Sequence, residues 1–269
     1  MSARILGVVN QKGGVGKTTT AHNVACQAKR EGYSVLLVDC DQQGTLSMLW
    51  GLTPTELIQL DTDRKTLLHA LLEPMAEQVP LLDVVVSAPD RPDLIPSSFR
   101  LGRLPQLLRY TPDLALKKAL RRPSGAAASD KYDLIVLDCP ASIGLMNACI
   151  LLAATDVLIP CLTQQLAFVS MQESLHEVHE VQMDSNNELQ VLGFLPTMVQ
   201  AQTHDRQVTE ALQSLAQRYN VPCFSPIPNA AAYKQAGAKS MSVMEFAPKT
   251  RGAEAYAAIV GTLMRGEAA

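Results

Sequence analysis

The amino-acid sequence predicts an α/β protein with a doubly wound, mostly parallel sheet that carries helices on both faces. An apolar run at residues 5–9 leads into a glycine-rich turn and then into a helical pattern at residues 21–30. Two more apolar runs, at residues 34–39 and 132–140, contain an aspartate at or near their end. Continuous apolar runs of this kind suit strands buried on both faces, as strands of parallel sheets usually are.

The chain is long enough for one well-buried domain, since it has 269 residues and no long linker or internal repeat. We therefore predict a single domain over residues 1–269, with residues 123–129 as a surface loop. No run of 18 apolar residues occurs, and the first strand begins near the N-terminus, so we expect neither a membrane span nor a signal peptide. The six cysteines form no C-x-x-C pair and are interpreted as buried thiols of a cytoplasmic protein.

Charge is segregated along the chain, although the formal net charge is only −3. Residues 100–131 hold eight Lys or Arg against two acids, whereas residues 132–205 contain no Lys or Arg at all. From residue 206 onward, seven basic residues stand against four acids. This distribution argues against a protein that coats nucleic acid with its whole surface, and it indicates separate faces for separate partners.

The glycine-rich turn, N-Q-K-G-G-V-G-K-T-T-T from Asn10, has the composition of a phosphate-binding loop. Glycines let successive backbone N–H groups point at one anion, and the N-terminus of the following helix adds partial positive charge. In such a loop Lys17 reaches the β- and γ-phosphates and the Thr18 hydroxyl ligates Mg²⁺. The predicted nucleotide-binding residues of this loop are Lys12, Gly13, Gly14, Val15, Gly16, Lys17, Thr18 and Thr19.

The loop departs from the strict pattern G-x-x-x-x-G-K-[ST], because Gln11 takes the first glycine position and Lys12 adds a second lysine. K-G-G-x-G-K-T-T resembles the deviant loop of the ParA/MinD family of dimerising ATPases. In that family the extra lysine crosses the subunit interface to the partner's nucleotide. The resemblance therefore implies that Lys12 acts in trans.

Two acidic motifs complete the predicted site. Asp39-Cys40-Asp41-Gln42-Gln43 resembles the family motif D-x-D-x-Q, in which Asp41 matches the residue that orients the attacking water. Asp39 has a supporting role near the metal or is an ordinary cap. Asp138 ends a Walker B strand and is expected to hold Mg²⁺ through water. Lys12, Lys17 and Asp41 are thus the predicted catalytic residues, with Thr18 and Asp138 on the metal.

The remaining pattern predicts further elements and a candidate partner surface. Helices are expected at residues 66–72, 99–110, 167–184 and 205–219, strands at 82–87, 157–160 and 190–195 and near Cys223, and a Pro-rich loop at 90–98. Acids recur at helical spacing at Glu173, Glu177, Glu180 and Asp184, either as a solvated face or as a dock for a basic peptide. His176 and His179 on the same helix could in principle chelate a metal.

The C-terminal part resembles the family's adenine pocket and DNA-contacting region. Met198 follows the strand that leads into that pocket, and Pro228 matches the backbone that closes over adenine. Asn229, Ala230 and Ala232 depart from the family pattern, and Gln202 stands where chromosomal members often carry Arg, so the usual DNA footprint is altered. Lys234, Lys239, Lys249 and Arg251 are the candidate replacements.

The resemblance spans residues 4–264 and implies a cycle. ATP and Mg²⁺ bind, a homodimer closes and holds nonspecific DNA on the nucleoid, and a ParB-like or other adaptor with a basic N-terminal segment stimulates a weak ATPase. The alternatives are a MinD-like membrane-associated positioning ATPase, which needs a basic amphipathic C-terminal helix, and an iron–sulfur carrier that pairs Cys139 and Cys149 at the dimer seam. The cargo stays open: plasmid, chromosome, organelle or protein cluster.

Overall fold

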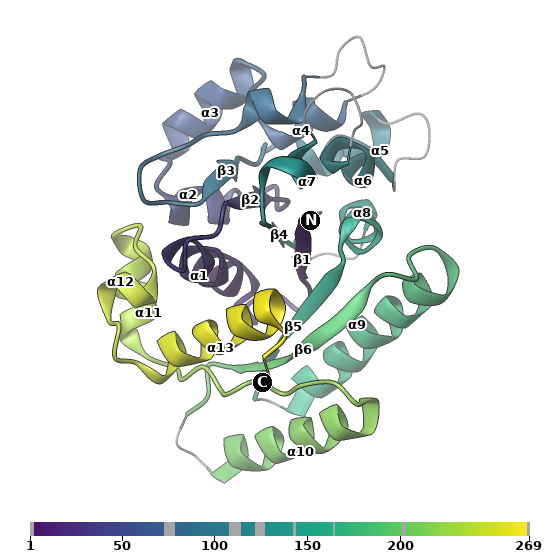
Figure 1. The fold of residues 1–269 in the computed structure, drawn as a ribbon, viewed down its shortest axis with the longest axis vertical. Helices are drawn as coiled ribbons and strands as arrows, with labels where there is room; N and C mark the ends of the chain where they lie inside the picture. Colours follow the sequence, from purple (N-terminus) through teal and green to yellow (C-terminus); the bar gives the residue numbers. More distant parts are fainter. Residues whose placement is uncertain are drawn as a thin grey trace.

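A six-stranded sheet forms the centre of the computed structural model (Figure 1). The structure describes residues 3–72, 79–107, 114–121, 127–141, 144–163, 165–200 and 203–267. The strand order is β3-β2-β4-β1-β5-β6, and every neighbouring pair in this sheet is parallel, which confirms the predicted architecture. The strands are β1 (Arg4–Val8), β2 (Val35–Asp39), β3 (Asp93–Ile95), β4 (Leu134–Asp138), β5 (Asp156–Leu162) and β6 (Gln190–Thr197).

The strand register brings the functional segments to one edge of the sheet. Asp138 pairs with Val8 on one side and with Asp39 on the other, so β1, β2 and β4 end at the same level. Because parallel strands share the direction of their carboxyl ends, the loops that follow them meet there. The glycine-rich loop after β1 and the aspartates that end β2 and β4 therefore lie together.

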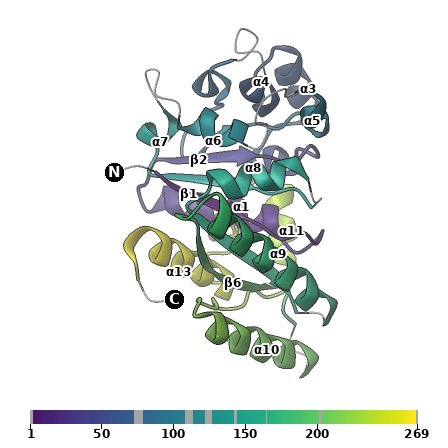
Figure 2. The same ribbon diagram turned by 90° about the vertical axis from the view of Figure 1, so that its right-hand side faces the viewer.

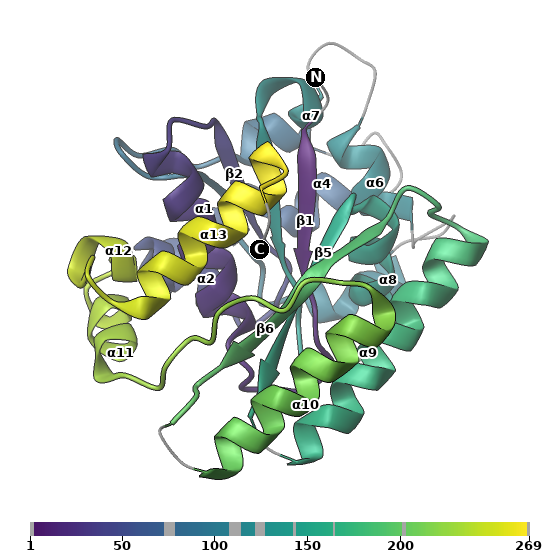
Figure 3. The ribbon, with the colours of Figure 1, turned by 60° about the horizontal axis from the view of Figure 1, so that its bottom comes forward.

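One face of the sheet is covered by the helices that flank the glycine-rich loop and by the C-terminal helices (Figure 3). Alternate side chains of the strands, such as Leu6, Leu37 and Val136, pack against these helices. The helices of this layer are α1 (Lys17–Arg30), α2 (Thr45–Trp50), α12 (Val243–Phe246) and α13 (Arg251–Arg265), with α11 (Ala231–Ala238) packed on α12.

The opposite face is covered by a second layer, seen most directly in Figure 2. The intervening strand residues, such as Ile5, Leu36 and Ile135, point into it. The helices of this layer are α4 (Leu67–Leu71), α6 (Ala115–Leu120), α8 (Leu145–Ala153), α9 (Gln165–Asp184) and α10 (Thr203–Tyr219). Two helical layers over one parallel sheet confirm the doubly wound arrangement, and α4, α9 and α10 confirm three predicted helices.

The segment between β2 and β4 differs from the prediction in several places. The expected strand at residues 82–87 is a 3-10 turn, η2 (Leu81–Val84), followed by a single antiparallel bridge from Val86 to Leu94. The expected loop at residues 90–98 contains β3, which adds to the edge of the sheet beside β2. Residues 54–62 form α3 (Pro54–Thr62), which begins at a capping box between Thr53 and Glu56.

The expected helix at residues 99–110 is divided into η3 (Leu101–Arg103) and α5 (Leu104–Leu107), and residues 108–110 lie outside the described residues. The predicted surface loop at 123–129 is wrong at its end. Ala127, Ala128 and Ser129 are buried, and α7 (Ala128–Lys131) begins within it. The expected strand near Cys223 is a single bridge to Phe194. No described helix has both the length and the apolarity needed to cross a bilayer.

Candidate nucleotide-binding site

The glycine-rich loop links the end of β1 to the first residue of α1. Helix α1 begins at Lys17, four residues earlier than the sequence pattern predicted, so Lys17, Thr18 and Thr19 form its first turn. Gly14 and Gly16 have φ angles of 76° and 88°, in the left-handed region that glycine adopts without strain. The loop therefore turns tightly onto the N-terminus of a 14-residue helix, where backbone N–H groups can bind an anion.

Side chains from two other segments hold this loop in place. Asn10 donates from Nδ2 to the Pro160 carbonyl in β5 at 2.8 Å, and its Oδ1 accepts from the Lys12 amide at 2.8 Å. The Thr197 hydroxyl at the end of β6 donates to the Val15 carbonyl at 2.8 Å. Both halves of the loop are thus anchored to β5 and β6.

Lys17 is held inside the loop. The residue is only 6% exposed, and its Nζ donates to the Lys12 carbonyl at 3.0 Å. Burial lowers the pKa of Lys17, while the nearby carboxylates of Asp138 and Asp41 oppose that shift. The ammonium is therefore placed between the loop and the acidic strand ends.

Asp138 is fully buried at the end of β4, and neither carboxylate oxygen has a hydrogen-bond partner of good geometry among the described residues. Burial and the neighbouring Asp39 raise its pKa well above the ordinary value, and the nearby Thr18 hydroxyl partly offsets this rise. A buried carboxylate without a partner is costly unless another group satisfies it. Carboxylate and hydroxyl oxygens are the donors that Mg²⁺ prefers, so Asp138 and Thr18 fit a magnesium ion.

Asp39 has a different environment from Asp138, although both are fully buried. Its Oδ2 accepts from the amide and the hydroxyl of Ser47 in α2, at 2.8 and 2.6 Å. Burial nevertheless raises the pKa of Asp39 to about 6. Asp39 thus fixes the start of α2 beside the site.

Asp41 lies beside the site on the wall of an open cavity of about 760 Å³. Its backbone is fixed by the Ser97 hydroxyl, which donates to the Asp41 carbonyl at 2.6 Å, and its Oδ1 accepts from the Gln43 amide at 3.0 Å. Ala141 also lines the cavity, and its Cβ lies 3.6 Å from the position that a Cβ on Gly13 of the loop would take. Asp41 therefore faces open space next to the phosphate-binding loop, where a water molecule has access.

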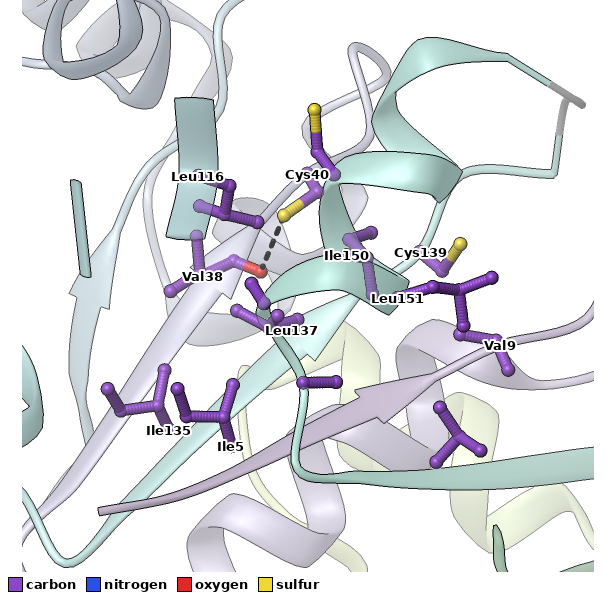
Figure 4. Packing of buried hydrophobic residues seen from close by; sticks show 14 of the residues in the cluster. Ile5, Val9, Val38, Cys40, Leu116, Ile135, Leu137, Cys139, Ile150 and Leu151 are labelled. Atoms are coloured by element: carbon purple, nitrogen blue, oxygen red, sulfur yellow. Dashed lines mark hydrogen bonds between the residues drawn. The ribbon is translucent and has the colours of Figure 1, made fainter. Parts of the chain in front are cut away.

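Cys40 and Cys139 follow two of these aspartates directly and point into the apolar layer beneath the site (Figure 4). Burial raises the pKa of both thiols, so they remain protonated near neutral pH. Cys149 is also fully buried, inside α8. Cys139 and Cys149, the pair considered for an iron–sulfur carrier, are therefore both buried.

The structure brings Met198 and Pro228 to the other side of the loop. Met198 has a φ of 55° and is 41% exposed, and its Cε lies 3.8 Å from the position that a Cβ on Gly16 would take. The neighbouring Val199 forms a parallel bridge with Pro228. Both predicted adenine-pocket residues thus stand at the edge of the sheet, next to α1.

The four candidate DNA-binding cations lie on one group of helices. Lys234 is in α11, Lys239 follows α11, Lys249 follows α12 and Arg251 begins α13, and all four are exposed. Figure 3 shows α11 and α12 beside the start of α13. We call these four residues the C-terminal basic patch. Gln202 lies outside the described residues.

The acidic face of α9 reaches the glycine-rich loop at one end. Gln11 donates from Nε2 to Glu177 at 3.1 Å, and its amide donates to the Ser174 hydroxyl at 3.3 Å. His176 contacts Glu180 at 3.4 Å, and the ring of His179 packs near Tyr219. Among the described residues, no group of three or more His, Cys, Asp or Glu side chains is arranged to hold a metal.

Sequence reasoning assigned no role to three residues that build the site: Asn10, Ser47 and Thr197. Asn10 stands inside the loop motif and Thr197 directly precedes Met198, but a polar residue in these places gives no sign of which carbonyl it will contact. Ser47 is eight positions from Asp39, and only the turn into α2 brings the two together. These contacts depend on tertiary structure.

The chain resembles known partition proteins over nearly its whole length. A protein-family model described as an AAA domain matches residues 3–191. The chain is 31% identical to the chromosome-partitioning ATPase Soj of Thermus thermophilus over 97% of this chain and 95% of Soj, and 30% identical to the chromosome partitioning protein ParA of Myxococcus xanthus over 97% and 88%.

Among solved structures, the cobyrinic acid a,c-diamide synthase of Mycobacterium smegmatis with bound ADP and magnesium has a TM-score of 0.77 and 32% identity, covering 98% of this chain and 94% of that one. A matching family model over more than half of the chain and relatives that are at least 30% identical over nearly its full length together identify the family. The chain belongs to the ParA family of P-loop ATPases.

Proposed function

We propose that this protein is a positioning ATPase that alternates between a monomer and an ATP-bound homodimer, and that the dimer holds nonspecific DNA. The observation that carries the proposal is the loop itself, in which Lys17 is buried beside Asp138 and a second lysine, Lys12, stands at its outer turn. The names of the relatives Soj and ParA support a role in partition.

ATP and Mg²⁺ are the ligands that the site is built to take. Lys17 and the backbone N–H groups of the loop would bind the phosphates, and Met198 and Pro228 would contact the adenine. Thr18 and Asp138 would hold Mg²⁺, the latter through water, and the ion supplies charge neutralisation on the phosphates. Asp41, on the wall of the open cavity, would orient the attacking water.

Lys12 gives a reason for pairing. Its side chain is half-buried, while Gly13 and Gly14 beside it are exposed, so this side of the loop is open to a second molecule. A cation added in trans to a phosphoryl-transfer site is worth roughly 10³–10⁵ in rate in other P-loop enzymes. We expect a smaller effect here, because a switch has to stay slow until its partner arrives.

The C-terminal basic patch is the proposed DNA surface. Its four cations are solvent-exposed and lie on adjacent helices, which is the arrangement that contacts successive phosphates. Binding to phosphates releases counterions, so the affinity should fall steeply with salt. This surface would replace the arginines that the sequence lacks at Asn229 and Ala232.

An adaptor with a basic N-terminal segment is the proposed partner. The acidic face of α9 supports this assignment, since residues 132–205 contain no Lys or Arg. The Gln11–Glu177 hydrogen bond joins that face to the loop, so an adaptor bound there would contact the nucleotide site. We place the protein in the cytoplasm, on the nucleoid in its ATP state.

The membrane-associated alternative has less support. Helix α13 is amphipathic, but its apolar side chains, including Tyr256, Ile259 and Leu263, are buried in the layer formed with α1. Arg265 near its end pairs with Glu31 and Glu267. An apolar face that packs in the core is not available to a bilayer. Co-sedimentation with anionic liposomes in the presence of ATP would favour this alternative.

DNA binding tests the proposal. Affinity for a random-sequence duplex is measured with ATP analogue and Mg²⁺, with ADP, and without nucleotide, over a range of salt concentrations. We expect binding to require the ATP state and to weaken with salt. Each patch substitution, such as Lys239→Ala or Lys249→Ala, should reduce the slope of log affinity against log salt by about 0.9. Lys65→Ala, at an exposed site before α4, is the control. DNA binding of equal affinity with ATP analogue, with ADP and without nucleotide would contradict the proposal.

A further inference from the structure

Asn23 joins the phosphate-binding helix to the helices of the C-terminal basic patch. It is a polar side chain that is only 3% exposed, on the face of α1 that packs against α12. Its Nδ2 donates to the Thr19 carbonyl at 2.7 Å, and its Oδ1 accepts from the Val243 amide at 2.7 Å. One buried amide thus connects the first turn of α1 to the first residue of α12.

Helix α12 in turn carries the surroundings of the patch. Ser242 and Glu245 form a capping box that fixes its start. The ammonium of Lys239 lies 5.1 Å from the ring centre of Phe246, the last residue of α12. A displacement of α12 would therefore carry Lys239 with it, and Lys249 follows only three residues after Phe246.

The same helices rest on a second element that starts at the nucleotide site. Ser47 in α2 donates to Asp39, as described above. The next residues of α2 support α11: Leu49 lies 3.0 Å from the position of a Cβ on Gly237, and the Met48 carbonyl accepts from the Ser240 hydroxyl at 3.4 Å. The patch is therefore carried by two helices, α1 and α2, whose first turns lie beside the phosphate and metal residues.

We propose that Asn23 is a positioning residue that transmits the nucleotide state to the basic patch within one protomer. This inference rests on the proposed function. When the first turn of α1 closes on a phosphate, the Asn23 link moves α12 and changes the spacing of the patch cations. ATP then raises the affinity for DNA through this internal coupling as well as through pairing. A ligand shifts such an equilibrium only by its differential affinity for the two states.

Reciprocity makes the coupling measurable. If ATP analogue changes the affinity for DNA by some factor, DNA must change the affinity for ATP analogue by the same factor. Allosteric coupling in proteins is typically about 5- to 150-fold. We expect the wild-type protein to show a factor of roughly five or more in both directions, and Asn23→Ala to reduce both factors to the part that is due to pairing. Reciprocity requires the two factors to agree in every variant, so a disagreement between them would show that unfolded protein distorts one of the measurements.

Two variants separate the link from a general loss of packing. Asn23→Asp keeps an oxygen for the Val243 amide but cannot donate to the Thr19 carbonyl, so it too should lose the coupling. Asn186→Ala is the matched control, because Asn186 is another buried asparagine, whose Nδ2 bonds backbone carbonyls of Leu151 and Ala154 far from α12. Asn186→Ala should keep the wild-type factor. A wild-type factor in either Asn23 variant would overturn the proposal.

Hydrogen exchange tests the link without a substitution at Asn23 and without DNA. Adding ATP analogue and Mg²⁺ should change the protection of the Val243 amide, and the Lys12→Ala protein, which we expect to stay monomeric, should show the same change. Unchanged protection of Val243 in both proteins would overturn the coupling. If no nucleotide state binds DNA, the proposed function fails, while the exchange experiment still decides whether α12 responds to nucleotide.

Discussion

Asp39 and Asp138 are partners in the parallel register of β2 and β4, and both are completely buried, yet only Asp39 is satisfied by the protein. Ser47 donates twice to Asp39, whereas Asp138 has no well-formed hydrogen bond among the described residues. Burial and the neighbouring Asp39 raise the pKa of Asp138 well above its ordinary value. This difference in hydrogen bonding indicates that Asp39 has a structural role, whereas Asp138 is available to bind a ligand.

Asp138→Asn should be more stable than the wild type without ligand and less stable than the wild type when nucleotide and Mg²⁺ are present. The amide cannot ionise, so it avoids the cost of a buried carboxyl group that has no well-formed hydrogen bond in the protein. We expect a gain of about 1–2 kcal/mol in unfolding free energy without ligand. The stabilisation that ATP analogue and Mg²⁺ give the wild type should be largely lost. Thermal unfolding with and without ligand measures both effects.

Asp39→Asn is the matched comparison for that experiment. Asn can accept both Ser47 bonds through its one carbonyl oxygen, but its Nδ2 then faces the Asp41 amide, which donates to Asp39 Oδ1 at 3.2 Å. The ligand-free protein should therefore gain less stability than Asp138→Asn or lose some. Equal gains from the two substitutions would mean that the unpartnered oxygens of Asp138 have no special cost.

Lys12 and Lys17 should fail in different ways. Lys17→Ala removes the buried ammonium from the loop and should abolish ATP binding. Lys12→Ala leaves that ammonium in place, so it should bind ATP analogue but form no ATP-dependent dimer. Isothermal titration measures binding, and light scattering at high protein concentration measures the mass. A normal ATP-dependent dimer from Lys12→Ala would contradict the action of this lysine in trans.

The sequence predicted the elements that surround the site more accurately than those farther away. A long apolar strand such as β4 buries both faces, so its composition is constrained at every position and its pattern is easy to identify. β3 has three residues in a segment with prolines at Pro92 and Pro96, and its strand conformation depends on pairing with β2. Local composition there favours a loop, and the sheet overrides it.

Contacts between distant segments could not be predicted from spacing. Asn23 occupies an ordinary position in a helical pattern, but its partner Val243 is 220 residues away. The apolar run after Pro80 indicated a strand, whereas Leu81 and Val84 are buried in a 3-10 turn. In both cases the side-chain types were compatible with more than one contact or conformation, and the packing of other elements determined which one forms.

Asp41→Ala should slow hydrolysis and prolong the life of the ATP-bound dimer. Removal of the side chain takes away the group that would orient water but leaves the loop, Lys17 and Asp138 untouched. Turnover is measured by phosphate release, and dimer lifetime by light scattering after excess ADP is added. Asp63→Ala removes an exposed carboxylate at the end of α3 and should change neither quantity. Wild-type turnover in Asp41→Ala would remove Asp41 from the mechanism.

His22 should make the protein less stable as the pH falls below neutral. It is 4% exposed in α1, with Cys26 at 3.6 Å from its Nε2, and burial lowers its pKa from 6.5 to about 4, an effect opposed by Glu245 and reinforced by Arg91. Between these two pH values the unfolded chain binds a proton that the folded protein excludes. Stability is therefore fully present above pH 6.5 and is lost as the pH falls toward 4.

His22→Gln should remove this part of the pH dependence. At about 1.4 kcal/mol per pKa unit, the loss due to His22 is on the order of 3 kcal/mol, and the variant should reduce the difference in unfolding free energy between pH 7 and pH 4 by a comparable amount. The readout is that difference, measured by urea unfolding, so a uniform loss of stability in the variant does not affect it. His176→Gln, on the exposed face of α9, is the control. An unchanged difference in His22→Gln would show that His22 is protonated in the folded protein, because burial would then not exclude the proton.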